Sequence, residues 1–443
     1  MKLRFSLSLT VLFLALSGTA FGSGFALKEQ SASALGNAFA GATAGAQDVT
    51  HMFFNPAALG NLESSQAAVV GSFIAPVSEF KGGTASTLLG TSISGPPERD
   101  DAAEDVLLPA LSGAWVVNDQ IRLGLGVNVP FGLETRYSDN WIGRYHAIDS
   151  KLETVNINPV LAWKINDKLT VAGGFQAQHA NATLSNAIDM GTIASAQGVP
   201  GAVPGSTAQD SFAELEGDDW GYGYTLGLLY EPRPGTRLGT AYRSKVSHTL
   251  EGEVEFEHKS VGQIVSGLSG QFKNTDVKAD LDTPETWSFG AYHEFNKKWA
   301  SMAEAAWTRW SRFEELRIRF ENPVQDDNVT VEDWDDTWFY ALGVTWMPLE
   351  AWAFKVGVAH DESPISRETR TPRIPANDRT WLALGAHWQL TPAIGLDGGY
   401  THIWVEDSSL DLEPMDPEDV RGSLSGEYEN RIDIATLQVT YTF

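Results

Sequence analysis

The chain of 443 residues contains no cysteine, which excludes disulfide bonds, thiol catalysis and metal sites built from cysteine. Basic residues are also scarce, with 31 Lys and Arg against 57 Asp and Glu. The formal net charge of −26 repels nucleic acid, so we exclude nucleic-acid binding. After Ser23, no stretch reaches the ~18 consecutive apolar residues that a membrane-spanning helix needs.

The N-terminus has the pattern of an export signal. Lys2 and Arg4 give a basic start, an apolar run covers residues 7–16, and small residues fit a cleavage site before Ser23. The apolar run is too short to span a membrane as a helix of ~20 residues. We therefore expect residues 1–22 to be a signal peptide.

Aromatic residues and glycine, in contrast, are abundant, with 15 Trp, 21 Phe, 11 Tyr and 42 Gly. An exported chain of this composition fits a large secreted β-protein or an outer-membrane barrel. The C-terminal stretch "ATLQVTYTF" favours the barrel, because apolar residues occupy every second position and the chain ends on the aromatic Phe443. In "WFYALGVTW", Trp338 and Trp346 flank an aliphatic face, which is the profile of a lipid-facing strand.

The links between strand-like segments alternate in length. Fourteen segments begin near residues 66, 105, 120, 151, 168, 212, 236, 272, 298, 336, 352, 378, 394 and 428. Six links are tight and rich in turn formers, beginning near residues 117, 165, 231, 295, 347 and 390. Seven are long and mostly polar, around 81–104, 131–149, 181–210, 259–271, 322–335, 367–377 and 413–427. This alternation predicts an all-β fold, a 14-stranded antiparallel transmembrane β-barrel over residues 65–443 with both termini periplasmic.

Residues 23–64 precede the first strand and show no alternation of this kind. They are rich in Gly, Ala and Ser, with short apolar patches such as Leu35, Phe39 and Phe53. A disordered periplasmic tail would carry more charge, and a buried backbone needs hydrogen-bond partners. We therefore predict that this segment is a compact N-terminal hatch, or plug, inside the lumen.

Several stretches between Ser23 and Phe443 resemble the long-chain fatty acid outer-membrane transporter family of the FadL/TodX type. They agree in order and spacing: "SGFALKEQSASALGNAFAG", "NPAALG", "VPFGLETRY", "WIGRYHAIDS", "GDDWGYGYTLGLLYEP", "RLGTAYRSKVSHTLEG", "TPETWSFG" and "DRTWLALG". The resemblance implies a monomeric barrel with an N-terminal hatch in the outer membrane of a Gram-negative bacterium. It also implies passive uptake, in which a hydrophobic ligand is captured in an outer groove, passes to an inner pocket and leaves sideways after the hatch moves.

The resemblance also assigns roles to individual residues. Asn55, Pro56 and Ala57 match the family's hatch motif, which lies against the opening in the wall. Phe25 matches the aromatic residue near the mature N-terminus that fills the inner pocket.

The third strand, where the family has a kink and a lateral gap, contains Pro130 and Gly132. Proline lacks the N–H that the ladder needs, and both residues favour a bend. Two interpretations remain open here. Either these residues mark a gap in the wall, or Pro130 simply ends the strand.

A carboxylate ligand would need a cation that faces the lumen. The alternation in "LGTAYRSKV" predicts that Tyr242 faces lipid while Arg243 and Lys245 face inward. The headgroup of a fatty acid is one possible partner of these cations, and a luminal Asp or Glu is the other.

We predict no cofactor, no metal site and no catalytic residue. The acidic runs near residues 100, 334 and 417 fall in outer loops and lack the spacing of a Ca²⁺ loop, and no phosphate loop or G-x-S-x-G elbow is present. The expected partners are a long-chain fatty acid or another hydrophobic small molecule, membrane lipid and lipopolysaccharide. Alternatives are uptake of aromatic or aliphatic hydrocarbons as in TodX, a general porin of usually 16 to 18 strands, and an outer-membrane hydrolase.

Overall fold

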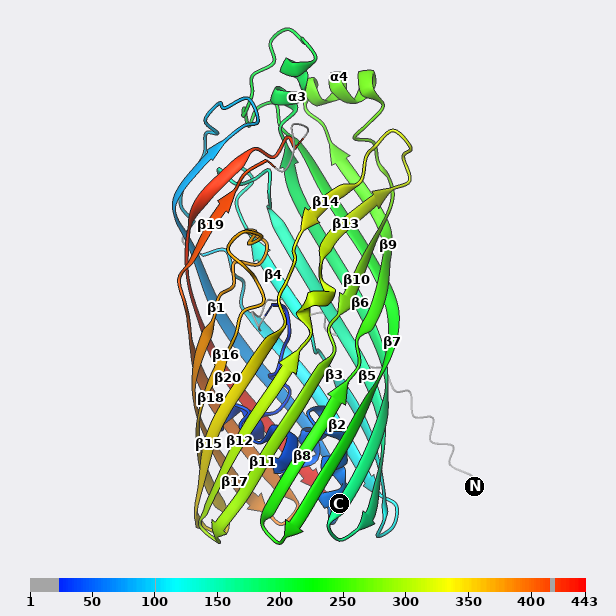
Figure 1. Cartoon of the computed structure of the whole chain (residues 1–443), viewed down its shortest axis with the longest axis vertical. Helices are drawn as coiled ribbons and strands as arrows, with labels where there is room; N and C mark the ends of the chain where they lie inside the picture. The colour runs from blue at the N-terminus through cyan, green and yellow to red at the C-terminus, as the bar shows by residue number, and fades with distance from the viewer. Residues whose placement is uncertain (1–23, 100, 415–418) are drawn as a thin grey trace, which may run out of the picture.

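The structure, a computed structural model, describes residues 24–99, 101–414 and 419–443. The expected signal peptide (1–22) and most of the acidic run near residue 417 lie outside these ranges. Twenty β segments form one sheet, in which β1 (Gln66–Ser86) pairs antiparallel with β20 (Ser423–Thr442) and closes the barrel (Figure 1). Among the described residues, no helix has the length and apolar character needed to cross a membrane.

The wall consists of 14 antiparallel strands, which confirms the predicted fold class. Eight strands are single segments: β1, β20, β2 (Val106–Val116), β5 (Asp149–Asn166), β6 (Leu169–Ile188), β7 (Ser211–Arg233), β16 (Trp352–Asp361) and β17 (Arg379–Thr391). Each of the other six consists of two segments: β3 (Ile121–Asn128) with β4 (Gly132–Arg136), β8 (Thr236–Arg243) with β9 (Val246–Glu257), β10 (Thr275–Thr283) with β11 (Thr286–Asn296), β12 (Trp299–Thr308) with β13 (Glu315–Phe320), β14 (Asn328–Val331) with β15 (Thr337–Leu349), and β18 (Ile394–Val405) with β19 (Ser408–Leu412).

The two ends of the barrel differ as the link lengths predict. Tight hairpins and the C-terminus lie at one end, and the long loops lie at the other, together with α3 (Met190–Ala196) and α4 (Ser260–Ser269) (Figure 1). A short helix-like turn, η3 (Trp310–Arg312), connects β12 with β13. Along the strands, apolar side chains face outward: Leu342 is 63% exposed and Leu437 is 73% exposed. Such a surface fits a hydrocarbon environment rather than water.

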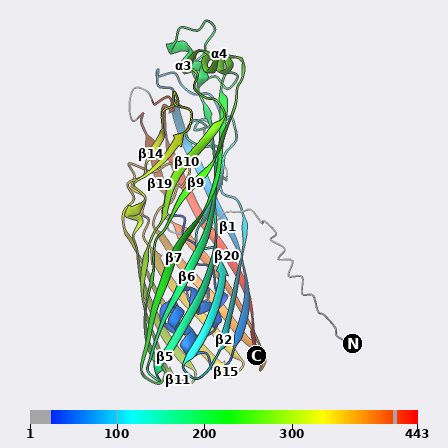
Figure 2. The ribbon, with the colours of Figure 1, turned by 90° about the vertical axis from the view of Figure 1, so that its right-hand side faces the viewer.

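Residues 24–64, which we call the N-terminal insert, lie inside the lower half of the barrel (Figures 1 and 2). The insert contains four short helical elements: α1 (Ala32–Leu35), α2 (Ala42–Gly45), η1 (Val49–Phe53) and η2 (Pro56–Asn61). Its backbone lies directly on wall glycines. A Cβ atom at Gly357 would be 2.0 Å from the carbonyl oxygen of Asn37, and one at Gly227 would be 2.1 Å from Oδ1 of Asn55. The small residues of the insert and the glycines of the wall therefore make this close approach possible.

Candidate functional site

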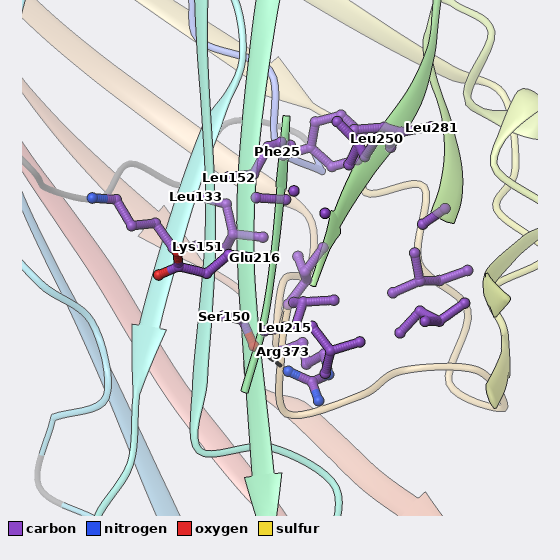
Figure 3. A pocket seen from close by; sticks show the side chains of 18 of the residues that line it. Phe25, Leu133, Ser150, Lys151, Leu152, Leu215, Glu216, Leu250, Leu281 and Arg373 are labelled. Carbon is purple, nitrogen blue, oxygen red and sulfur yellow. Dashed lines mark hydrogen bonds between the residues drawn. The ribbon is translucent and has the colours of Figure 1, made fainter. Parts of the chain in front are cut away.

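An apolar cavity occupies the barrel between the insert and the long loops. The space free of protein atoms there, including space open to solvent, is about 820 Å³. Its apolar lining comes from the N-terminal insert, from strands β4, β5, β6, β7, β9, β10 and β13, and from the loops: Phe25, Leu133, Leu152, Ala182, Leu184, Leu215, Leu250, Val277, Ala279, Leu281, Phe313, Leu316, Ile318 and Ile374 (Figure 3). We call this the upper cavity. Its lining suits an aliphatic or aromatic ligand.

Phe25 lies at the end of the upper cavity that faces the insert. The side chain is 2% exposed, and its ring centroid lies 4.8 Å from that of Trp310, 5.6 Å from that of Trp334 and 5.8 Å from that of Phe131. The contacts with Trp310 and Phe131 are edge-to-face, a geometry that contributes ~0.5–1.5 kcal/mol beyond area burial. Phe25 is thus held in place by aromatic residues of the wall and loops.

The third wall strand is interrupted where the sequence has Pro130 and Gly132. β2 pairs with β3 only up to the pair Leu111 and Val127, and the next pairing on that side is an isolated bridge, Ala103 with Thr135. The strand nevertheless resumes as β4, and both halves pair with β5 on the other side. The segment β3 thus ends at Asn128, just before Pro130, and β4 continues the same wall strand after the interruption.

The N-terminal segment takes the place of β2 at this interruption. Leu27 N donates to the carbonyl oxygen of Pro130 at 2.8 Å, and Gly132 N donates to that of Phe25 at 2.9 Å. The side-chain amide of Gln30 donates to the carbonyl oxygen of Val129 at 2.7 Å and accepts from Val129 N at 3.3 Å. Residues 25–30, which we call the N-terminal segment, thus satisfy backbone groups that the missing ladder leaves open.

A second cavity lies between the insert and the interrupted strand, and the space free of protein atoms there, including space open to solvent, is about 800 Å³. We call it the lower cavity. The N-terminal segment lies between the two cavities, because Phe25 lines the upper one while Ala26, Leu27 and Lys28 line the lower one. The lower cavity is also bounded by Phe39, Ala42, Phe53, Phe54, Pro56, Pro130, Phe131, Thr225, Ala241, Tyr242, Arg243, Thr286, Ser288, Glu304, Ala306, Thr308 and Phe339.

Arg243 lies at the edge of the lower cavity, facing inward as predicted. Its guanidinium donates to the carbonyl oxygen of Phe53 at 2.7 Å and to Oε1 of Gln176, and it lies 4.5 Å from the ring centroid of Phe53. Within the described part of the chain, no carboxylate lies within 4.0 Å of this guanidinium. Of the two alternatives left open, the ion pair with a luminal acid is therefore not found for Arg243 among the described residues, and Arg243 remains a candidate for binding a headgroup.

The prediction that Lys245 faces inward is wrong. The interruption between β8 and β9, at Ser244 and Lys245, shifts the alternation, so that Val246 and His248 are buried and Ser247 is exposed. Lys245 Nζ forms an ion pair with Asp282 at 2.8 Å, and neither cavity is lined by Lys245. A one-residue shift moves every following side chain to the other face.

The predicted hatch motif holds the insert to the wall and also contributes to the lower cavity. Asn55 Nδ2 donates to the carbonyl oxygens of Thr43 (2.7 Å) and of Leu228 in β7 (3.1 Å). Its Oδ1 accepts from Ala57 N at 2.9 Å. Pro56 lines the lower cavity, which Pro130 also lines. The motif therefore faces the interruption from across this cavity, while Asn55 itself is bonded to β7.

None of the four charged residues at the upper cavity, Lys151, Glu216, Glu332 and Arg373, was predicted from the sequence. Residues 367–377, expected to be a long polar outer link, form most of the loop 362–378, which turns into the lumen and brings Arg373 to the cavity. Burial lowers the pKa of Arg373 to about 10. Glu332, also at the cavity, is 5% exposed, and burial raises its pKa to about 8. The loop contains two isoleucines, Ile365 and Ile374, among its arginines and prolines. These apolar residues are the feature of the local sequence that could have indicated burial.

Comparisons with known proteins agree with this geometry. A family described as "outer membrane protein transport protein (OMPP1/FadL/TodX)" matches residues 13–443. The chain is 29% identical to a long-chain fatty acid transport protein of Escherichia coli, over 89% of this chain and 90% of that protein.

Among solved structures, a FadL homologue of Pseudomonas aeruginosa has a TM-score of 0.86 at 27% identity, covering 95% of this chain and 100% of the other. The toluene transporter TodX of Pseudomonas putida has a TM-score of 0.65 at 16% identity, covering 89% and 94% of the two chains. At that identity the likeness concerns the fold alone.

Proposed function

Because this chain belongs to the OMPP1/FadL/TodX family of outer-membrane transport proteins, we propose that it takes up long-chain fatty acids passively across the outer membrane of a Gram-negative bacterium. The ligand enters from the loop end, binds in the upper cavity, passes the N-terminal segment and reaches the lower cavity. It then leaves sideways into the membrane at the interrupted third strand. A long alkyl chain gains ~0.8 kcal/mol per buried CH₂, so apolar cavities that open to lipid suit it better than an aqueous pore.

One observation carries this proposal: the N-terminal segment both separates the cavities and completes the interrupted strand. Phe25 forms part of the upper cavity, and the bonds of Leu27 and Gly132 join the segment to the strand at the lower cavity. Moving residues 25–30 would therefore connect the two cavities and free the strand edge in one step. Residues 24–64 would act as the hatch, with Asn55, Pro56 and Ala57 fixing its body to the wall.

The proposed substrate is an acid because the lower cavity holds a half-buried cation, Arg243, whose hydrogen bonds go to neutral partners. A buried Arg without a counter-ion is costly, and a carboxylate beside Arg243 would supply one. The second candidate is uptake of neutral hydrocarbons, which is favoured by the almost wholly apolar lining of the upper cavity.

A reversible cross-link tests whether the N-terminal segment must move. Ala26 and Phe131 form an antiparallel bridge flanked by the bonds of Leu27 and Gly132, so they face each other as a non-hydrogen-bonded pair with Cα atoms ~4.5 Å apart. That spacing suits a disulfide, and the chain has no other cysteine. In cells that lack their own transporter, Ala26→Cys/Phe131→Cys should take up labelled oleate when reduced and not when oxidised.

The control is a second isolated bridge, Ser86 with Ser92, which lies in an outer loop and is flanked in the same way. Ser86→Cys/Ser92→Cys should take up oleate equally in both redox states. Equal uptake by oxidised and reduced Ala26→Cys/Phe131→Cys would show that the segment need not move. Uptake of labelled toluene without oleate would favour the second candidate.

A further inference from the structure

The loop 362–378 lies inside the lumen and lines part of the upper cavity. Tyr137 Oη donates to the carbonyl oxygen of Pro372 at 2.7 Å, and Asn430 Nδ2 donates to that of Pro375 at 2.8 Å. Ile365 and Ile374 are 6% and 7% exposed and belong to the same apolar cluster as Phe25. Wall residues far apart in the sequence therefore hold this loop in place.

Arg370 fixes the loop from within. Its guanidinium donates to the carbonyl oxygens of Ala376 at 3.1 Å, Ser409 at 2.9 Å and Ile365 at 3.4 Å. The several N–H donors of this guanidinium thus join two parts of the loop to each other and to β19. Arg370 does not line the upper cavity, so its role is to shape the loop.

Arg373 differs from Arg370 in its surroundings. Its guanidinium donates hydrogen bonds to Ser150 Oγ at 2.8 Å, to the carbonyl oxygen of Asp149 at 3.1 Å and to that of Ser185 at 3.5 Å. No carboxylate of the described ranges comes within 4.0 Å of the guanidinium. A cation thus lies at an apolar cavity with neutral partners only, a costly arrangement unless an anion completes it.

The other charged residues at the cavity do not neutralise Arg373. Lys151 and Glu216 belong to the cavity wall, but their side chains point away from the leucines (Figure 3), and Lys151 is paired with Glu153 at 3.2 Å. Glu332 accepts a bond from Trp334 Nε1 at 2.9 Å. Since burial raises the pKa of Glu332 to about 8, this residue is mostly neutral at pH 7, and the cavity carries a net positive charge.

We propose that Arg373 binds the carboxylate of an acid substrate in the upper cavity, and that the inward-folded loop 362–378 thereby selects acids over neutral hydrocarbons. This inference rests on the proposed function. The alkyl chain then lies along the leucines of β4, β5, β6, β7, β9 and β10, and Arg373 fixes the polar end beside Ser150. Guanidinium and carboxylate match as planar, bidentate partners.

The test is equilibrium binding of labelled oleate and labelled oleyl alcohol to the purified full-length barrel in detergent. The two probes differ in the charged headgroup and share the alkyl chain. We expect Arg373→Met to weaken oleate binding by about 10- to 100-fold, the range for a lost charge-assisted bond, and to leave oleyl alcohol unchanged. Compared with Arg373→Met, Arg373→Lys should recover part of the oleate affinity. Lysine keeps the positive charge but lacks the planar pair of donors that binds a carboxylate bidentately.

Two control variants separate binding from structure and from net charge. Arg136→Met removes an outward-facing cation whose side chain is 57% exposed and paired with Asp149 at 2.7 Å, so it should leave both probes unchanged. Arg370→Met perturbs the loop itself and should weaken both probes alike.

Equal weakening of oleate and oleyl alcohol by Arg373→Met would assign Arg373 a structural role and overturn the inference, as would no effect on either probe. If the wild-type protein fails to bind oleate at all, the proposed substrate class and this inference fall together. If oleate binds through Arg373 but the oxidised Ala26→Cys/Phe131→Cys protein still transports it, only the proposed route is wrong.

Discussion

Replacing Phe25 by Ala should detach the N-terminal segment from the interrupted strand. The ring is 2% exposed and lies among four aromatic side chains, and deleting a buried Phe side chain costs ~3–5 kcal/mol. The bonds of Leu27 and Gly132 remain, but each contributes only ~0.5–1.5 kcal/mol. Because every 1.4 kcal/mol is a factor of ten, the segment should open about 10²- to 10⁴-fold more often.

Hydrogen exchange measures this opening directly. The amides of Leu27 and Gly132 donate across the interruption at 2.8 and 2.9 Å, so peptides that cover residues 25–30 and 129–133 report whether the segment is bound. In the Phe25→Ala protein both peptides should exchange faster, while peptides from the paired parts of the wall should keep their protection.

A matched control separates local opening from general loss of stability. Phe80 is 0% exposed and contacts Trp141 and Tyr428 with ring centroids 5.4 and 4.9 Å apart, in a cluster without residues of the insert. Phe80→Ala should lower thermal stability without faster exchange at Leu27. Unchanged exchange at Leu27 in Phe25→Ala, or equal acceleration in both variants, would refute the reasoning.

Three further predictions concern the insert and the upper cavity. Asn55→Ala removes two donated bonds and one accepted bond, so the unfolding free energy should fall by ~1–3 kcal/mol and oleate uptake should fall, as read by thermal unfolding and transport. Gly357→Ala places a Cβ atom 2.0 Å from the Asn37 carbonyl oxygen and should destabilise insert packing by ~1–3 kcal/mol, whereas Gly267→Ala, with nothing within 4 Å, should not. Since burial raises the pKa of Glu332 from 4.5 to about 8, its contribution to stability should be greatest below pH 4.5 and be lost as pH rises through 8. Over that upper range oleate binding should weaken as Glu332 becomes an anion, and Glu332→Gln should remove this pH dependence.

The wall of the barrel could be predicted because its signals are local. A period of two along each strand follows from the pleat, whatever the strand packs against. Turn residues specify tight links without help from distant contacts. The alternation of short and long links then fixes the number and direction of the strands, and the structure has the 14 that the sequence predicts.

The site could be predicted only where a local pattern extends to it. Pro130 and Gly132 mark the interruption because proline cannot donate to a ladder, and Arg243 faces inward because β8 pairs with both neighbouring strands without a register shift from Leu238 to that residue. The prediction that Lys245 faces inward was wrong because the break between β8 and β9 shifts the alternation by one residue. No pattern in the local sequence indicates this shift.

What only the tertiary structure decided is which distant segments meet. The loop 362–378 has the composition of an exposed loop, yet bonds from Tyr137 and Asn430 hold it in the lumen and place Arg373 at the cavity. The N-terminal segment joins the third strand through backbone groups, which are the same in every residue and so leave no trace in the sequence. The sequence by itself determined a 14-stranded outer-membrane barrel, whereas the two cavities and the segment between them depend on contacts between segments that lie far apart in the sequence.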